Sequence, residues 1–497
     1  MSAAMDVRRI VFLALLGGGL ALAHIDSPDV YLDGSAGPYP LFITVRPPAV
    51  IPGVAEIQIR TSSADVRELH VTPLPLTGDG AKFAPTPDQM RRSAQDPQFF
   101  TGNLWIMKTG SWQIRIQASG SKGNAELSVP VPAVATGIKK MDKLLGALLL
   151  VLMLILIAGV VSIVGAGVRE AQLEPGIAPD AKRRSRARWI MGVTAALVVA
   201  IVFLGNVWWT AEANSYSRNI YRPMQVEPSV DGGKLTLRMD AVTAEKRRWD
   251  NFLAERKIDD FLPDHGHLMH LYVIRWPAMD RVWHLHPEMT GPGVFMQNLP
   301  DMPAGDYRMY GDVVHSTGFP ETVVAEIHTF GIQGTPLTGD DVGGSGPAIE
   351  PSGGNTVISD LPDGYKMVWD RPSGAIEANR PMLFKFHIET PNGAVARDLG
   401  LYMGMPGHAA FVKTDGTVFA HVHPSGSIAM PALALANPGD SMQNMPGMDM
   451  SGSSTVAPPT EVSFPFGFPK PGEYRIVVQI KRAGTVETGM FNAIVRI

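Results

Sequence analysis

The chain has 497 residues, which is enough for three or four domains, and its charges nearly balance at 43 basic and 47 acidic residues. This balance predicts no nucleic-acid-binding surface. Cysteine is absent, which excludes disulfides, thiolate metal ligands and cysteine nucleophiles. The 51 glycines and 41 prolines favour short strands and turns in the soluble part of the chain.

The amino terminus has the features of a secretory signal peptide. Arg8 and Arg9 precede the apolar run Ile10–Leu22, and Ala21-Leu22-Ala23 supplies small residues for a cleavage site. The run is short for a membrane span. We therefore expect residues 1–23 to be removed, which makes His24 the first residue of the mature protein. An uncleaved anchor is the alternative.

Residues 24–138 are expected to form a β-sandwich. Apolar and polar residues alternate in Leu41–Arg46, Ala55–Arg60 and Trp112–Gln117, which is the pattern of strands with one buried face. Proline and glycine separate these segments, as turns between short strands require.

Two uncharged apolar runs, 144–168 and 189–209, are each long enough to cross a bilayer as a helix. Two buried core helices are the alternative. The connecting segment 169–188 is rich in arginine and lysine, so it is expected in the cytoplasm. The large flanking regions would then lie on the periplasmic or extracellular side of a bacterial inner (cytoplasmic) membrane. The runs carry no embedded charge, which argues against transport through them.

Residues 211–332 and 356–497 are expected to form two further β-sandwiches, joined by a linker at 333–355. A glycine two positions before an aromatic residue opens a strand-like segment at Gly110, Gly305 and Gly472, and each segment is followed by a turn and a closing strand. This recurrence predicts three immunoglobulin-like sandwiches. The predicted fold class is therefore mainly β, with a two-helix transmembrane hairpin.

All 13 histidines fall on the predicted exported side, and two groups end in H-x-H-P. In 407–424, a turn at Thr414-Asp415 would place His408 opposite His421, with His423 on the same face. Three imidazoles on one patch can bind zinc or copper. Met403 and Met405, just before this segment, offer thioether ligands.

A looser copy of this hairpin occupies 266–287. His267 matches His408 by sequence, whereas His270 is opposite His284 by hairpin geometry, and only one of the two is expected to join His284 and His286 unless a bulge intervenes. Further candidates are Asp264, His265 and His315. For any single histidine, a bond to a main-chain carbonyl at a strand end is an equal alternative.

The predicted loop 430–460 of the third sandwich is rich in methionine, at Met442, Met445, Met448 and Met450. Thioethers prefer Cu(I) to zinc, while imidazoles accept either metal. Histidine and methionine without cysteine therefore favour copper as the cofactor, with zinc as the alternative. A disordered loop of biased composition is the other explanation of the methionines.

A free terminal His24 would offer an amine and an imidazole to one metal ion. On a β-sandwich this resembles the copper site of CopC-like domains and the histidine brace of copper monooxygenases. The resemblance implies copper at His24. An ordinary exposed terminus is the alternative.

The segments YMGMPGHAAFVKTDGTVFAHVHP and FPFGFPKPGEYRIVVQIKRAGTVETGMF resemble YtkA/FixH-like domains of bacterial envelope proteins. The resemblance covers 352–497 and, more loosely, 226–332. It implies an immunoglobulin-like sandwich and an envelope location, and it supplies no activity.

These observations predict a membrane-anchored, extracytoplasmic copper-binding protein that serves as a sensor, buffer or chaperone. Its expected partners are the membrane, a metal ion and another envelope protein that handles metals. One alternative is a copper-dependent oxidase or monooxygenase centred on His24, and another is a non-catalytic interaction scaffold. No triad order, P-loop or dinucleotide fingerprint supports a conventional enzyme.

Overall fold

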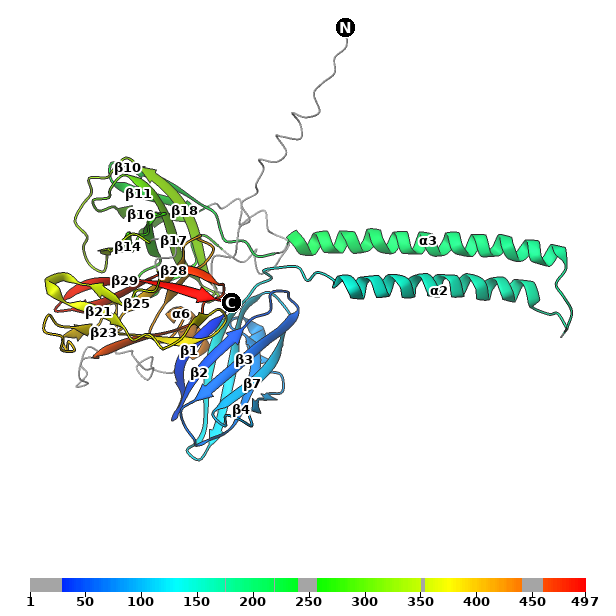
Figure 1. Cartoon of the computed structure of the whole chain (residues 1–497), viewed down its shortest axis with the longest axis horizontal. Helices are drawn as coiled ribbons and strands as arrows, with labels where there is room; N and C mark the ends of the chain where they lie inside the picture. Colours follow the sequence, from blue (N-terminus) through cyan, green and yellow to red (C-terminus); the bar gives the residue numbers. More distant parts are fainter. Residues whose placement is uncertain (1–28, 175, 219, 240–256, 350–353, 440–458) are drawn as a thin grey trace, which may run out of the picture. The chain divides into compact units, whose positions relative to one another are not determined.

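The computed structural model describes residues 29–174, 176–218, 220–239, 257–349, 354–439 and 459–497. It divides into two compact units, which are described separately (Figure 1). One unit contains the sandwiches and comprises the residues up to Val134 together with Tyr221–Ile497. The other unit, Ala135–Ile220, contains two helices.

The helical unit consists of α2 (Lys143–Glu170) and α3 (Ala181–Arg218), which lie side by side (Figure 1). Both are long and apolar enough to cross a membrane. The Asp142 carboxylate caps α2 by accepting the Leu145 N–H at 2.9 Å. Both helices extend beyond the predicted runs, and α3 takes in most of the basic residues that were expected in the connecting loop.

The amino-terminal sandwich has one sheet in the order β1-β2-β3-β7-β6 and a second in the order β5-β4-β8-β9. In β3, buried Ala55, Ile57 and Ile59 alternate with more exposed polar side chains, as the sequence pattern predicts. The strand bounds are β1 Val30–Ala36, β2 Tyr39–Arg46, β3 Gly53–Thr61, β4 Val66–Pro75, β5 Asp88–Gln89, β6 Arg91–Arg92, β7 Phe99–Ile106, β8 Gly110–Gly120 and β9 Gly123–Ala133.

The second sandwich pairs a sheet of order β10-β11-β16-β15 with one of order β12-β17-β13-β14-β19, to which β18 is added beside β17. The strand bounds are β10 Val226–Asp231, β11 Lys234–Met239, β12 Phe261–Leu262, β13 His270–Trp276, β14 Arg281–Leu285, β15 Glu288–Gly291, β16 Val294–Asn298, β17 Gly305–His315, β18 Pro320–Thr329 and β19 Val342–Ser345. Strand β19 lies within the predicted linker 333–355, so this segment forms part of the sheet as well as joining the domains.

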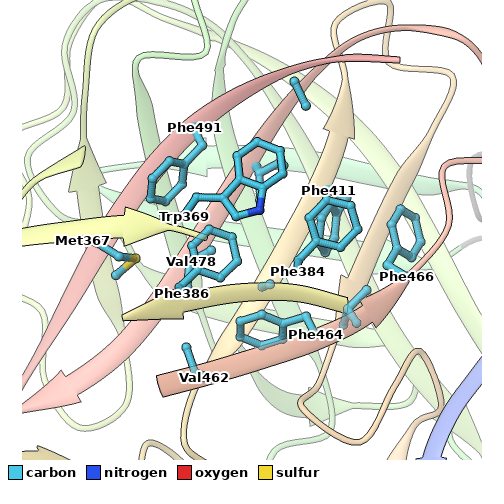
Figure 2. Packing of buried hydrophobic residues seen from close by; sticks show 14 of the residues in the cluster. Met367, Trp369, Phe384, Phe386, Phe411, Val462, Phe464, Phe466, Val478 and Phe491 are labelled. Carbon is cyan, nitrogen blue, oxygen red and sulfur yellow. The ribbon is translucent and has the colours of Figure 1, made fainter. Parts of the chain in front are cut away.

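The third sandwich pairs a sheet of order β20-β21-β23-β27 with one of order β22-β29-β28-β25-β26, to which β24 is added beside β28. Its core is aromatic: Trp369 stacks on Phe384 and contacts Phe491 edge-on (Figure 2). The bounds are β20 Ile358–Asp360, β21 Lys366–Trp369, β22 Ile376–Glu377, β23 Met382–Glu389, β24 Leu399–Gly400, β25 His408–Lys413, β26 Phe419–Val422, α6 Met430–Ala436, β27 Glu461–Phe466, β28 Gly472–Arg482 and β29 Thr485–Arg496.

The three domains share the repeat that the sequence predicts. Gly110, Gly305 and Gly472 begin β8, β17 and β28, and each of these strands pairs antiparallel with the next strand along the chain. All three glycines have a positive φ, at 148°, 145° and 136°, a conformation that other residues rarely adopt. The glycine of the motif is therefore required by the backbone at the start of each strand.

The second and third sandwiches meet through equivalent sheets. Tyr272, Tyr310, Ala410 and Phe419 lie in one buried apolar cluster that draws on both domains. The rings of Tyr310 and Phe419 stack with centroids 4.3 Å apart and an interplanar angle of 4°. This contact brings the two predicted H-x-H-P hairpins together within one compact unit.

Part of the predicted methionine-rich loop 430–460 is a short buried helix. Helix α6 packs Met430 and Leu433 into the core cluster of the amino-terminal sandwich. Just after it, the Asn437 side-chain amide donates to the Ser128 carbonyl and accepts the Ser128 N–H, both at 2.8 Å. The segment therefore fastens the third sandwich to the first.

We predict that Asn437→Ala destabilises this junction, because it leaves the Ser128 main-chain groups without their side-chain partner. The expected loss in the free energy of unfolding is about 1–3 kcal/mol. Urea denaturation of the detergent-solubilised chain measures it. The variant Asn298→Ala, at an exposed strand end, is the control and should be close to neutral; equal midpoints for the two variants would contradict the assignment.

Candidate metal centre

The two histidine hairpins are equivalent, and both differ from the predicted register by two residues. In the second sandwich Tyr272 pairs with His284, and in the third Ala410 pairs with His421. The last pair before the turn is Val412 with Phe419, so the connection is longer than the predicted tight turn at Thr414-Asp415. A shift of two residues keeps every side chain on its face. The histidines therefore still gather on one surface.

Equivalent nitrogen atoms approach each other in the two hairpins. His270 Nδ1 lies 3.1 Å from His284 Nε2, and His408 Nδ1 lies 3.2 Å from His421 Nε2. The sequence match of His267 to His408 was wrong, because His270 occupies the position equivalent to His408. Two imidazole nitrogens bound to one metal ion at about 2.0–2.1 Å would be about 3–3.4 Å apart.

Among the residues that the structure describes, three groups of side chains have candidate ligand atoms that all lie within 4.8 Å of one another. Two of them are the hairpin sets predicted from sequence, and the third adds Asp264 and His265 to His423. The groups are His270, His284 and His286; His408, His421 and His423; and Asp264, His265 and His423.

The groups form one continuous cluster across the domain boundary. The rings of His270 and His421 have centroids 5.2 Å apart, and those of His284 and His421 are 5.5 Å apart. At its edges, His267 stacks on His286 at 4.0 Å and His265 lies 5.0 Å from His423. We call these eight residues the histidine cluster: His265, His267, His270, His284, His286, His408, His421 and His423.

Acceptors outside the histidine cluster determine which nitrogen carries the proton in three of its rings. The main-chain carbonyls of Asp264 and Ile428 accept from His270 Nε2 at 3.1 Å and His423 Nδ1 at 3.2 Å. The Asp341 carboxylate accepts from His286 Nδ1 at 3.0 Å. The remaining nitrogen of each ring must therefore carry its lone pair into the cluster.

The central histidine of each hairpin is held by the opposite domain. Gln479 Oε1 of the third sandwich lies 2.9 Å from His284 Nδ1, and Asp312 Oδ2 of the second lies 3.5 Å from His421 Nδ1. Gln479 is the strand partner of His408 in β25 and β28, and Asp312 is the strand partner of His270 in β13 and β17. The two residues therefore occupy equivalent positions, and their contacts with the opposite domain are reciprocal. Sequence reasoning missed both residues, although each stands seven positions after its strand-opening glycine.

Burial keeps these imidazoles neutral. Burial and neighbouring histidines lower the pKa of His270, His284, His408 and His421 well below the ordinary value. Burial also lowers the pKa of His423 to about 4. Neutral imidazole is the form that binds metals.

Among the described residues, several buried polar atoms in and beside the histidine cluster have no hydrogen-bond partner: the Nε2 atoms of His265, His286, His408 and His423, and Asp264 Oδ1, which lies 3.6 Å from His265 Nε2. An unpartnered buried polar atom costs about 1–3 kcal/mol. A metal ion would satisfy the inward-facing Nε2 atoms of His286 and His423. The donor set therefore fits a transition metal that accepts imidazole ligands.

The other predicted ligands fall into two sets. His315 lies outside the three groups and contacts Asp260 and Glu321. Met405 is buried in the core cluster of the amino-terminal sandwich. Met403, in the adjoining turn, has a positive φ of 51°. The remaining candidates, together with the predicted signal peptide, lie outside the described residues: His24, Met442, Met445, Met448 and Met450.

Comparison with known proteins supplies no activity. A family model described as a domain of unknown function (DUF8832) matches residues 228–329 and 358–496, which contain both hairpins. Its description names neither YtkA/FixH-like nor CopC-like domains. No curated protein matches the chain significantly.

Similar solved structures include a tetra-tandem repeat from the extending region of a large adhesion protein, with 10% sequence identity and a TM-score of 0.16. The match covers 92% of this chain and 74% of that chain. A putative membrane anchored protein from Corynebacterium diphtheriae is similar over 94% of each chain, with 10% sequence identity and a TM-score of 0.15. An engineered protein matches at 14% identity with a TM-score of 0.15, over 18% of this chain and 19% of its own length. TM-scores this low support no conclusion about this chain.

We predict that His315 has a structural role and that its contribution depends on pH. Burial alone would lower its pKa, but hydrogen bonds to Asp260 at 2.8 Å and Glu321 at 3.1 Å outweigh burial and raise the pKa. The imidazolium therefore stabilises the fold below pH about 6.5, and the contribution is lost as pH rises through the raised pKa of the folded state.

Accordingly, His315→Gln should lower the free energy of unfolding at pH 6 by about 3–5 kcal/mol, because it removes the imidazolium that pairs with buried Glu321. The loss should shrink as pH rises. Denaturation at several pH values measures it. His328→Gln removes an exposed histidine paired with Asp306 and should change stability little. A pH-independent effect of His315→Gln would refute the electrostatic explanation.

Proposed function

We propose that this chain is a membrane-anchored metal-binding protein that holds copper in the histidine cluster. The proposal rests chiefly on the inward-facing lone pairs of His270, His286 and His423, which follow from the acceptors on the opposite side of each ring. Metal-binding histidines generally donate their second N–H to a carbonyl or carboxylate in this way.

The equivalent positions of the two hairpin groups add support. Each group supplies three imidazoles, and each central imidazole has a polar contact with the opposite domain. A histidine that only ends a strand needs no such reciprocal arrangement. Metal bound in these groups would also stabilise the contact between the second and third sandwiches, since ligand binding to the folded state favours that state.

Copper is proposed over zinc because the chain combines histidine imidazoles with methionine thioethers. Imidazole accepts Cu(I), Cu(II) and zinc, but the methionine-rich sequence 442–450 adds thioethers, which favour Cu(I). Those methionines would capture or pass on the ion, as in a sensor, buffer or chaperone. A partner envelope protein that delivers or receives copper would complete this role.

The two apolar helices support anchoring in a membrane. The basic residues where α2 ends and α3 begins favour a cytoplasmic location for this end of the helix pair, which would place the sandwiches on the outer side of the bacterial cytoplasmic membrane. The proposed location is thus the cell envelope, with the domains resembling YtkA/FixH-like domains. An oxidase or monooxygenase using His24 remains the alternative activity that requires cleavage after Ala23.

We predict that the purified full-length chain in detergent binds about two copper ions, one for each three-histidine hairpin group. Combined His421→Ala and His423→Ala changes should abolish binding at the third-sandwich group and halve the copper content. Elemental analysis after gel filtration measures this.

The control for that experiment is His387→Ala, which changes a β23 histidine paired with Asp370. It should leave the copper content unchanged. A native chain that binds neither copper nor zinc in stoichiometric amounts would refute the proposal and favour an interaction scaffold.

We further predict that Gln479→Leu weakens copper binding at the second-sandwich group about 10–100-fold, because His284 loses the acceptor that orients it. Competition with a chelator of known affinity measures the change. Gln113→Leu replaces another largely buried glutamine, in the amino-terminal sandwich, and should leave affinity unaltered. Equal affinities for Gln479→Leu and the native chain would show that the contact is only structural.

A further inference from the structure

A cavity of about 80 Å³ adjoins the histidine cluster where the three sandwiches meet. The first sandwich contributes Trp112 and Pro130, the second contributes Asp312 and Val314, and the third contributes Ala432 of α6. A single water molecule needs roughly 10–15 Å³ of such volume, so the cavity has room for several small molecules of that size.

The cavity reaches both hairpin groups. His270 from the second sandwich lines it, as do His421 and His423 from the third. Two of the three imidazoles of the third-sandwich group therefore border the same small space. A metal ion held by three protein ligands keeps a coordination position for an exogenous ligand, whereas structural sites usually close with four.

The walls favour small ligands of low charge. Ala420, Ala429 and Ala432 form part of the lining and leave space near the imidazoles, while larger apolar residues limit its extent. Four carboxylates lie in the wall and would oppose a multiply charged anion: those of Asp29, Asp264, Asp312 and Glu321. The Ser427 hydroxyl accepts the Tyr31 N–H at 3.0 Å, and its own O–H can donate to a bound ligand.

We propose that this cavity is a binding site for a small exogenous ligand of two or three atoms, neutral or singly charged, which coordinates the metal held by His408, His421 and His423. This inference rests on the proposed metal binding and extends it. The third-sandwich group would then hold its metal ion with one coordination position open to an exogenous ligand. In a site that only stores metal, protein ligands would fill every coordination position.

Azide is a suitable probe, because it is small, singly charged and gives a charge-transfer band when it binds Cu(II). The full-length chain, loaded with Cu(II) in detergent, is titrated with azide and followed by absorption and electron paramagnetic resonance. We expect a saturable new band and an altered copper resonance.

Filling the cavity should then block azide without removing copper. Ala432→Leu and Ala429→Leu each place a larger side chain in the wall, and each should raise the azide dissociation constant at least about tenfold by overfilling the space. Ala434→Leu, an exposed position on the same helix, is the matched control and should behave as the native chain. Having two cavity variants guards against misfolding of one.

The outcomes separate the two proposals. A native chain without bound copper overturns the proposed function and this inference with it. A copper-loaded native chain whose spectra do not respond to azide overturns this inference alone. So does native azide affinity in copper-loaded Ala432→Leu and Ala429→Leu.

Discussion

The face-to-face contact of two equivalent hairpins determines most of what is distinctive in this structure. Strands β13 and β14 meet β25 and β26 through an apolar layer that includes stacked Tyr310 and Phe419. The same contact buries most of the histidine cluster away from water, whereas His267 at its edge keeps 28% of its side chain exposed. Buried imidazoles cannot readily become charged, so they must find partners as neutral groups. Outer acceptors provide one partner for several rings, which leaves the inner nitrogens to be satisfied by something else.

Much of this arrangement could be predicted from the sequence. The alternation in Ala55–Arg60, the repeated strand-opening glycines and the two apolar runs indicated sandwiches and two membrane-length helices. The histidines of each hairpin were also predicted to share one face, and they do. The prediction succeeded because side-chain alternation in a strand survives a register shift of two residues.

The contact between domains could not be predicted in the same way. Gln479 and Asp312 act on histidines more than a hundred residues away, and sequence periodicity carries no information about such pairing. The register error has a local origin, because a longer connection before Phe419 replaced the expected tight turn. The internal repeat was nevertheless a usable signal: residues seven positions after Gly305 and Gly472 are the two that cross the boundary.

The two halves of the histidine cluster are similar without being identical, and the difference has chemical consequences. His421 faces a carboxylate, Asp312, which also accepts from Thr322 Oγ1 at 2.6 Å, whereas His284 faces the neutral amide of Gln479. A carboxylate behind an imidazole increases the basicity of that imidazole. The second-sandwich group also has one, because Asp341 accepts from His286 Nδ1 at 3.0 Å. Under the proposed function, each group would therefore contain one imidazole with a carboxylate behind it, at a different position in its hairpin. Two histidines of the third-sandwich group, His421 and His423, border the cavity, whereas only His270 of the second-sandwich group does. The two groups therefore differ in which histidine has a carboxylate behind it and in how many of their imidazoles border the cavity.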